Sequence, residues 1–189
     1  ELARVIPVIE ALAARFAQPV SIDTTKSAVA REALSAGASI LNDVATGDAP
    51  EALGAVAAEY SAMYVAMHAR GVPATMRSLA HYGDVVAEVC AELRAYVGRV
   101  LAAGVAPERL VVDPGLGFAK TAAHSLALLA DLAALRALGY PVCVGASRKS
   151  FLVADEAHPP GWARDDSAAA DRLGGTAAVV ALSVSQGAE

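Results

Sequence analysis

Long hydrophobic runs, abundant aromatic residues and a surplus of basic residues are all missing from this chain of 189 residues. No apolar run approaches the roughly 20 residues of a transmembrane helix, and no charged leader precedes an apolar stretch, so we expect a cytoplasmic protein without a membrane partner. Aromatic residues make up only 5% of the chain and hydrophobic residues 56%. This composition favours helices packed on a buried parallel sheet over an aromatic-rich β-sandwich.

Basic residues and metal-ligand patterns are also sparse. The net charge is −5 and the Lys and Arg residues are scattered, which argues against a nucleic-acid partner. The two cysteines, Cys90 and Cys143, lack metal-ligand spacing, so we expect both to be reduced packing residues. No cluster of His, Asp and Glu indicates a metal site built by this chain alone.

The pattern of apolar residues predicts one helix followed by five strand–helix units, in a single domain over residues 1–189. The strands are expected at 20–22, 39–41, 62–67, 110–112 and 142–146, and the helices at 1–16, 26–36, 51–59, 84–103, 125–138 and 167–186. Thr24 or Thr25 is expected to cap the second helix, and Gly37 to end it. This order requires a parallel sheet with right-handed crossovers. Because a closed barrel needs eight strands, a small open sheet and part of a TIM barrel both fit, and we favour the partial barrel.

Each predicted strand ends in polar residues, namely Asp23, Asn42, His68, Asp113 and the group Ser147, Arg148 and Lys149. In a parallel barrel the carboxyl ends of the strands open on one face, where sites are built. Two carboxylates, a carboxamide and an ammonium suit a flat polar heterocycle with amino, N–H and carbonyl edges. Taken singly, these residues also fit turns and helix caps, and His68 fits a partly buried hydrogen-bonding residue.

A glycine-rich segment, Pro114–Lys120, follows the fourth predicted strand. It lacks the Gly-Lys-Ser/Thr ending of a P-loop, so its glycines indicate that the backbone passes close to a ligand or another loop. Phe118 fits two roles equally well, as the wall of an aromatic pocket or as a residue packed beneath the loop.

Four motifs, in this order and at this spacing, resemble dihydropteroate synthases of folate biosynthesis: SIDTTKSAVAREALSAGASILNDV, MHARGVPATM, DPGLGFAKTAAHSLALL and VGASRKSFL. The resemblance implies a TIM barrel of the pterin-binding type, here incomplete with about five βα units, and a homodimer for the full-length protein. It also implies the activity of a transferase, which condenses 7,8-dihydropterin-6-ylmethyl diphosphate with 4-aminobenzoate and releases 7,8-dihydropteroate and pyrophosphate. Sulfonamides compete with 4-aminobenzoate in this family.

The resemblance assigns roles to individual residues. It implies pterin contacts for Asp23, Asn42, Met67, Asp113, Arg148 and Lys149, and 4-aminobenzoate contacts for Ser147, Phe118 and Lys149. The planar Arg148 guanidinium would lie against the pterin ring. His68, in the motif MHAR, is a weaker candidate contact.

The chain also departs from the family. The resemblance places the residues for Mg²⁺ and diphosphate outside residues 1–189, so we expect no metal ligand within this chain and little or no activity from it alone. Ala119 and Ser125 replace a common Gly and Asn, and Asp155–Asp171 form an insertion of the kind that varies between lineages.

Three other functions fit parts of the sequence. A pterin-binding methyltransferase domain shares the barrel and the strand-end Asp and Asn, but is not expected to carry the Ser-Arg-Lys-Ser cluster at 147–150. A non-catalytic pterin-binding paralogue would not need the leaving-group residues. A generic phosphate-binding TIM-barrel lyase would prefer a Schiff-base lysine inside a strand, and the sequence has none there.

Overall fold

The computed structural model describes residues 1–44, 49–153 and 172–188 of the chain. The chain divides into two compact units. The first unit consists of Glu1–Met67 and Leu93–Val112, and the second of His68–Glu92 and Asp113–Glu189. Neither unit is therefore a continuous segment of the sequence.

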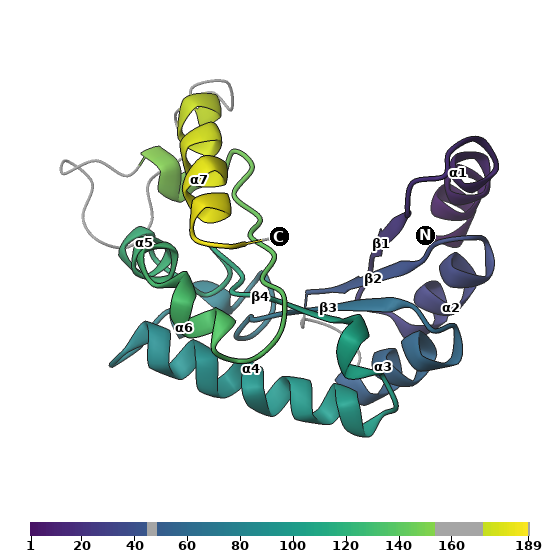
Figure 1. Cartoon of the computed structure of the whole chain (residues 1–189), viewed down its shortest axis with the longest axis horizontal. Coiled ribbons are helices and arrows are strands. Elements are labelled where there is room, and N and C mark those ends of the chain that lie inside the picture. The colour runs from purple at the N-terminus through teal and green to yellow at the C-terminus, as the bar shows by residue number, and fades with distance from the viewer. Residues whose placement is uncertain (45–48, 154–171, 189) are drawn as a thin grey trace. The chain divides into compact units, whose positions relative to one another are not determined.

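The strands form a sheet in the order β1–β2–β3–β4 (Figure 1). Their bounds are β1 (Ser21–Asp23), β2 (Ile40–Asp43), β3 (Met63–Met67) and β4 (Leu110–Asp113). β1 and β2 run parallel with Asp23 opposite Asn42, and β2 and β3 run parallel with Asn42 opposite Val65. Alternate strand residues are inaccessible, as at Leu41 and Val112, which are both 0% exposed, whereas residues between them, such as Ile40 and Val65, are half-buried. The sheet is parallel, as predicted, and one of its faces is more deeply buried than the other.

Helices alternate with the strands in the predicted order. They are α1 (Leu2–Arg15), α2 (Ser27–Ser35), α3 (Pro50–Glu59), α4 (Val85–Ala102), α5 (Ala122–Ala130), α6 (Leu132–Arg136) and α7 (Leu173–Ser185), with short 3₁₀ turns η1 (Met76–Leu79), η2 (Pro107–Arg109) and η3 (Ser150–Val153). Gly37 and Gly104 follow α2 and α4 with φ angles of +114° and +104°. Glycine adopts this left-handed conformation without steric cost and so ends these helices. Within the described ranges, no helix is both long enough and apolar enough to cross a bilayer.

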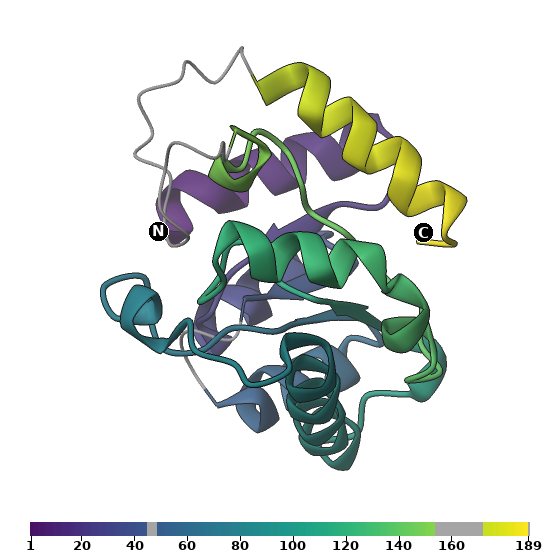
Figure 2. The same ribbon diagram turned by 90° about the vertical axis from the view of Figure 1, so that its left-hand side faces the viewer.

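The helix predicted over residues 125–138 is two helices in the structure, α5 and α6, and Figure 2 shows the change of direction between them. Asp131 separates them with non-helical angles, φ −130° and ψ 57°, and its Oδ1 accepts the N–H of Ala134 at 3.2 Å. An Asp side chain that bonds nearby backbone competes with the continuing helix and caps a new one. The prediction of a single helix was therefore wrong.

The predicted fifth strand, over residues 142–146, is also absent from the described part of the chain. Only Val142 makes a strand-like bridge, and the segment leads into a turn at Ser147 and Arg148. Val142 and Ala146 are buried, so the apolar pattern correctly indicated burial. A strand needs in addition a neighbouring strand to hydrogen-bond along its length. The described residues accordingly form a sheet of four strands instead of the predicted five.

The starts of two helices also differ from the predictions. Lys26, not Thr24 or Thr25, occupies the N-cap of α2, and the Thr24 Oγ1 accepts the Lys26 N–H at 3.3 Å. The hydroxyl thus supports the turn before the helix instead of capping the helix itself. The predicted start of the last helix at Ser167, and the insertion Asp155–Asp171, lie outside the described residues.

Candidate active site

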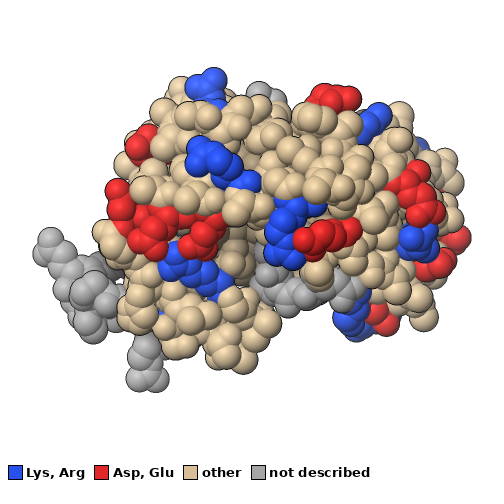
Figure 3. Space-filling view, turned by 90° about the horizontal axis from the view of Figure 1, so that it is seen from below, with Lys and Arg blue, Asp and Glu red and all other residues tan. Residues whose placement is uncertain are grey.

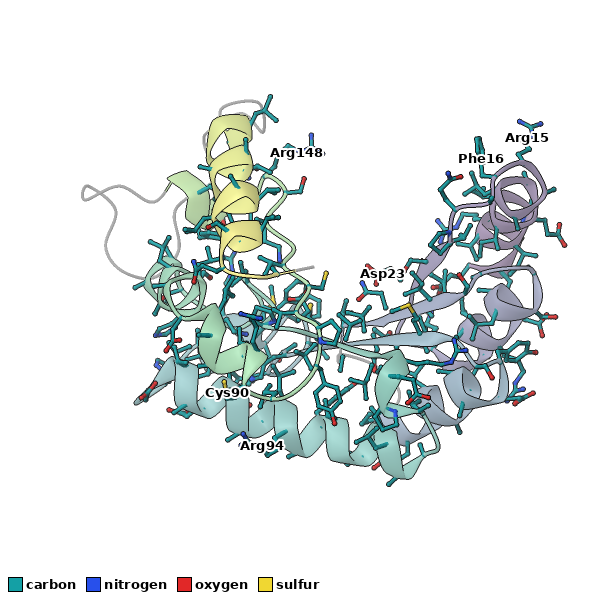
Figure 4. All side chains as sticks on the ribbon, in the orientation of Figure 1. Arg15, Phe16, Asp23, Cys90, Arg94 and Arg148 are labelled. Atoms are coloured by element: carbon teal, nitrogen blue, oxygen red, sulfur yellow. The ribbon has the colours of Figure 1, made fainter. Side chains whose placement is uncertain are left out.

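Two predicted pterin contacts, Asp23 and Asn42, end up side by side at the carboxyl ends of β1 and β2. The parallel register places the two residues opposite each other, and their side chains are hydrogen-bonded. Partial burial raises the pKa of the Asp23 carboxyl, the hydrogen bond from Asn42 opposes this shift, and the charge of Asp43 adds to it. Figure 4 labels Asp23 at the end of its strand. Neighbouring strands therefore present a carboxylate and an amide together.

A second carboxylate near these residues, Asp43 on β2, is completely buried and was not predicted as a site residue. Successive residues of a strand point to opposite faces, so Asp43 points away from the face that carries Asn42. Its Oδ2 accepts hydrogen bonds from the hydroxyl of Tyr64 on β3, at 2.5 Å, and from that of Tyr96 on α4. Burial raises the pKa of both tyrosines, so both hydroxyls remain protonated donors. This cluster fixes the end of β2 and with it the position of Asn42.

The second unit brings together two further predicted pterin contacts, Asp113 and Lys149. Asp113 is 8% exposed, and its Oδ1 accepts the N–H of Gly115 at 2.7 Å. A Cβ atom placed on Gly145 would lie 3.9 Å from the Asp113 Oδ2 and 3.8 Å from the Lys149 Nζ. A carboxylate and an ammonium therefore converge beside a residue that has no side chain.

Burial shifts both groups of this pair toward their neutral forms. It raises the pKa of Asp113, while the Gly115 N–H and the charges of Lys149 and Lys120 act in the opposite direction. It lowers the pKa of Lys149, and the charge of Asp113 opposes that shift. The two groups thus stabilise each other's charged forms in a desolvated place, where hydrogen bonds are electrostatically stronger than in water.

The loop between β4 and α5 passes next to Lys149. The Lys149 Nζ donates to the Leu116 carbonyl oxygen at 2.6 Å and lies 5.2 Å from the centre of the Phe118 ring. Three residues of the loop have positive φ angles, Gly115 (64°), Gly117 (82°) and Ala119 (50°). The glycines adopt this conformation readily, whereas Ala119 is strained in it. The loop therefore places Phe118, a predicted 4-aminobenzoate contact, at the edge of the Asp113–Lys149 pair.

His68 lies in a row of polar side chains within the second unit. It is 4% exposed, with Nε2 2.9 Å from Glu92 Oε2 and Nδ1 2.7 Å from Lys120 Nζ. Burial and the charge of Lys120 lower the pKa of His68 to about 4, so the ring is neutral at pH 7. The Arg70 Nε also donates to both oxygens of the Glu92 carboxylate, at 3.1 Å each. Because protein groups engage both ring nitrogens, the geometry favours the hydrogen-bonding role of His68 over ligand contact.

The remaining predicted contacts occupy different environments. Met67 is 4% exposed at the end of β3, whereas Ser147 and Arg148 are exposed in the turn before η3. The Arg148 backbone has a φ of 51°, its N–H donates to Thr176 Oγ1 at 2.9 Å, and its carbonyl oxygen accepts from Arg172 Nη1 at 2.6 Å. The start of α7 thus holds the Arg148 backbone, while Figure 4 shows its side chain directed outward from the turn.

Sequence reasoning missed two buried groups, Lys120 and the Asp43 cluster. The alternation of strand residues could have predicted that Asp43 and its neighbour Asn42 face opposite sides of the sheet, because adjacent strand residues cannot face the same side. Lys120 gives a fainter signal, since a lysine at the end of a glycine-rich loop is usually solvated. In the sequence, only the two apolar residues directly before it, Phe118 and Ala119, indicate that Lys120 is buried.

Ligands for a metal ion are not grouped together in the described part of the chain. No three His, Cys, Asp or Glu side chains within residues 1–44, 49–153 and 172–188 are grouped so that they could hold a metal ion. A Mg²⁺ ion held by one or two carboxylates together with substrate phosphates and waters would not need such a group. Figure 3 shows acidic and basic side chains next to each other on one face of the molecule.

A parallel sheet with alternating helices and with acidic and amide side chains at its strand ends defines the class: an α/β domain of the TIM-barrel type, a fold in which sites are built at the carboxyl ends of the strands. The chain belongs to the pterin binding enzyme family, whose model matches residues 1–189.

Individual relatives within this family are dihydropteroate synthases. The Mycobacterium leprae enzyme is 52% identical over 153 residues, which are 80% of this chain and 54% of that enzyme. The Synechocystis enzyme is 41% identical over 191 residues, which span all of this chain and 63% of that enzyme.

Solved structures show the same similarity. The Thermus thermophilus dihydropteroate synthase in complex with 4-aminobenzoate has a TM-score of 0.86 and 44% identity, covering 99% of this chain and 68% of that one. The same enzyme in complex with 6HMPPP has a TM-score of 0.86 and 43% identity, and the match covers 100% of this chain and 70% of that one. The fold is thus a pterin-binding TIM barrel of which this chain comprises a part.

Proposed function

We propose that the full-length protein is a dihydropteroate synthase, which condenses 7,8-dihydropterin-6-ylmethyl diphosphate with 4-aminobenzoate to give 7,8-dihydropteroate and pyrophosphate. The observation that carries the proposal is the convergence of Asp113 and Lys149 beside Gly145, with Phe118 at their edge. The family and the 4-aminobenzoate and 6HMPPP complexes of the Thermus thermophilus enzyme support the same reaction.

The reaction needs binding and orientation more than a protein nucleophile. The C–O bond between the pterin methylene and the diphosphate breaks, the arylamine nitrogen forms the new C–N bond, and that nitrogen loses a proton. Holding the two reactants in line removes much of the entropic barrier, and fixed polar groups stabilise the charge that develops. The residues described above suit these two tasks on the pterin side.

The proposed pterin contacts are hydrogen bonds along the polar edges of the ring. Asp113 would accept from the ring's amino and N–H groups, and Lys149 would donate to its carbonyl and ring nitrogen. The fact that each opposes the neutralising effect of burial on the other supports charged partners for the ring. Asp23 and Asn42 would contact a further edge, Met67 would pack against the ring, and Arg148 would stack on it.

The proposed 4-aminobenzoate contacts are Phe118, Ser147 and Lys149. Phe118 offers an aromatic face, Ser147 an exposed hydroxyl, and Lys149 a cation. 4-Aminobenzoate has an apolar ring between a carboxylate and an amine, and this structure matches one aromatic and two polar partners. Binding of sulfonamides, which carry the same aniline group, follows from the proposal.

Calorimetric titration of a stable pterin analogue into the full-length protein tests the proposal. Asp113→Asn should weaken binding roughly 10- to 100-fold, because a hydrogen bond to a charged acceptor contributes about 1.5–3 kcal/mol. Binding should also weaken as the pH falls through the pKa of Asp113, which lies above its usual range. Asp131→Asn is the control, since this exposed carboxylate only caps α6.

Pyrophosphate release on mixing both substrates tests the reaction itself. The proposed function fails if the wild-type protein releases none, or if Asp113→Asn and Asp131→Asn bind the pterin analogue equally well. The proposal also includes a homodimer, drawn from the family resemblance, and a cytoplasmic location, drawn from the sequence composition. Analytical ultracentrifugation and cell fractionation test these two points.

A further inference from the structure

Lys120 is the buried charged residue that the proposed reaction leaves without a role. Its side chain is 1% exposed although it follows a surface loop, and burial lowers its pKa to about 7. Burying an ammonium is unfavourable unless its donors find partners. The partners of Lys120 therefore indicate what the residue does.

The three donors of the Lys120 ammonium have three acceptors. The Nζ atom lies 2.7 Å from His68 Nδ1, 3.0 Å from the Phe118 carbonyl oxygen and 3.4 Å from the His68 carbonyl oxygen. The direction of the first bond follows from the other side of the ring. Arg70 and His68 hold the pKa of Glu92 below its ordinary value, so Glu92 is an ionised acceptor and the proton of the neutral ring lies on Nε2. Nδ1 is then an acceptor, and Lys120 donates to it.

The loop that these bonds hold is not part of a helix or strand, so it has few of the backbone hydrogen bonds that stabilise such elements. The Gly115 N–H bonds to Asp113 Oδ1, the Leu116 carbonyl accepts from Lys149 Nζ, and the Phe118 carbonyl accepts from Lys120 Nζ. Two lysines thus hold alternate carbonyl groups of the same loop. Lys149 lies in the proposed binding site, so a ligand there competes for its bond to Leu116. The bond from Lys120 lies in the interior and does not depend on a ligand.

We propose that Lys120 is a positioning residue for 4-aminobenzoate: it fixes the loop that carries Phe118 by binding the Phe118 carbonyl and the His68 side chain simultaneously. The inference rests on the proposed function, because it concerns the second substrate of that reaction. Lys120 acts through Phe118 and does not touch the substrate, since its donors are already engaged and its side chain is inaccessible. His68 and Glu92 complete the support by orienting the ring to which Lys120 binds.

The test uses the full-length protein and the variant Lys120→Met, which keeps the length of the side chain and removes its donors. The Michaelis constant for 4-aminobenzoate should rise about tenfold, because displacing a positioning group by a fraction of an ångström costs rate and affinity. The Michaelis constant for the pterin diphosphate should change less than twofold. Val100→Ala, in the buried face of α4 within the first unit, is the control for a general loss of stability.

Two further measurements do not need activity. Amide exchange over residues 115–119 should be faster in Lys120→Met than in Val100→Ala. In the wild-type protein, long-range ¹H–¹⁵N spectra, assigned with His68→Gln, should show a neutral His68 ring protonated on Nε2 between pH 5.5 and 8. This spectrum tests the bond from Lys120 to His68 even where Lys120→Met does not fold.

The outcomes separate the two proposals. A wild-type protein without turnover overturns the proposed function, and the role of Lys120 in substrate positioning falls with it. Normal wild-type turnover combined with equal changes in both Michaelis constants overturns the role of Lys120 alone. A His68 ring that titrates near the ordinary pKa of about 6.5 also overturns the role of Lys120 alone.

Discussion

The end of β2 and the loop after β4 both present predicted pterin contacts, but they are built in opposite ways. At the end of β2, Asn42 is held by the sheet register and by the buried carboxylate of Asp43 behind it. In the loop after β4, the backbone adopts three positive φ angles and is held by side chains that bind its N–H and carbonyl groups. The first region is fixed by regular secondary structure and the second by individual hydrogen bonds.

This difference teaches where stability and binding are coupled in the molecule. A residue behind a strand can be essential for folding without touching a ligand, as Asp43 shows. A half-buried residue that bonds to the loop, such as Lys149, can bind a ligand while contributing less to the fold than a fully buried one. Substitutions in the two regions should therefore separate loss of stability from loss of affinity.

The largest expected effect is on stability, from Asp43→Ala. The change leaves the hydroxyls of Tyr64 and Tyr96 without their common acceptor in a buried place. Loss of such a charged acceptor should lower the free energy of unfolding by about 3 kcal/mol. Urea denaturation of the full-length protein measures this. Asp131→Ala, which removes an exposed cap, should cost only about 1 kcal/mol, and equal losses in the two variants would contradict the comparison.

The second largest expected effect is on binding of a pterin analogue, in the variant Lys149→Ala. Removal of the ammonium beside Asp113 should weaken binding of a pterin analogue roughly 10- to 100-fold. The free energy of unfolding should change by less than about 1 kcal/mol, because the residue is only half-buried and its ammonium donates to a loop carbonyl, that of Leu116. Titration calorimetry and urea denaturation on the same samples separate the two quantities. Lys26→Ala, whose exposed ammonium binds Glu1 at 2.8 Å, is the control for lost charge.

The smallest effect is a gain, from Ala119→Gly. Ala119 has a φ of 50° and is fully buried, so a residue without a Cβ atom removes backbone strain there. The change should raise the free energy of unfolding by about 1 kcal/mol. Ala33→Gly, in the middle of α2, should lower it by a similar amount, because glycine is unfavourable in a helix. Thermal unfolding that shows the same sign for both variants would argue against strain in the loop.

The regular part of the fold could be predicted from the sequence. Short apolar strands followed by helical patterns located β1 to β4 within a residue or two, and glycines marked the ends of α2 and α4 correctly. These features depend on local chemistry alone, namely side-chain periodicity and the conformational freedom of glycine. Asp23 and Asn42 could be paired for the same reason, since parallel strands bring their carboxyl ends together.

The irregular part could not be predicted, because it depends on contacts between distant segments. The apolar run at Val142 is buried as expected but forms no strand, since strand formation depends on a neighbour that the run itself does not encode. Lys120 is buried because His68, 52 positions away in the chain, supplies an acceptor. Asp131 breaks a helix that the apolar pattern alone would have continued through it.

The discontinuous make-up of the two units has a consequence for synthesis on the ribosome. The first unit needs residues 93–112 in addition to residues 1–67, and the intervening stretch 68–92 belongs to the second unit. A nascent chain that ends before β4 has therefore made β3 without its neighbour on that side. An unpaired strand edge is a site for association with other chains. The protein should accordingly be most dependent on chaperones while the segment between β3 and β4 is being translated.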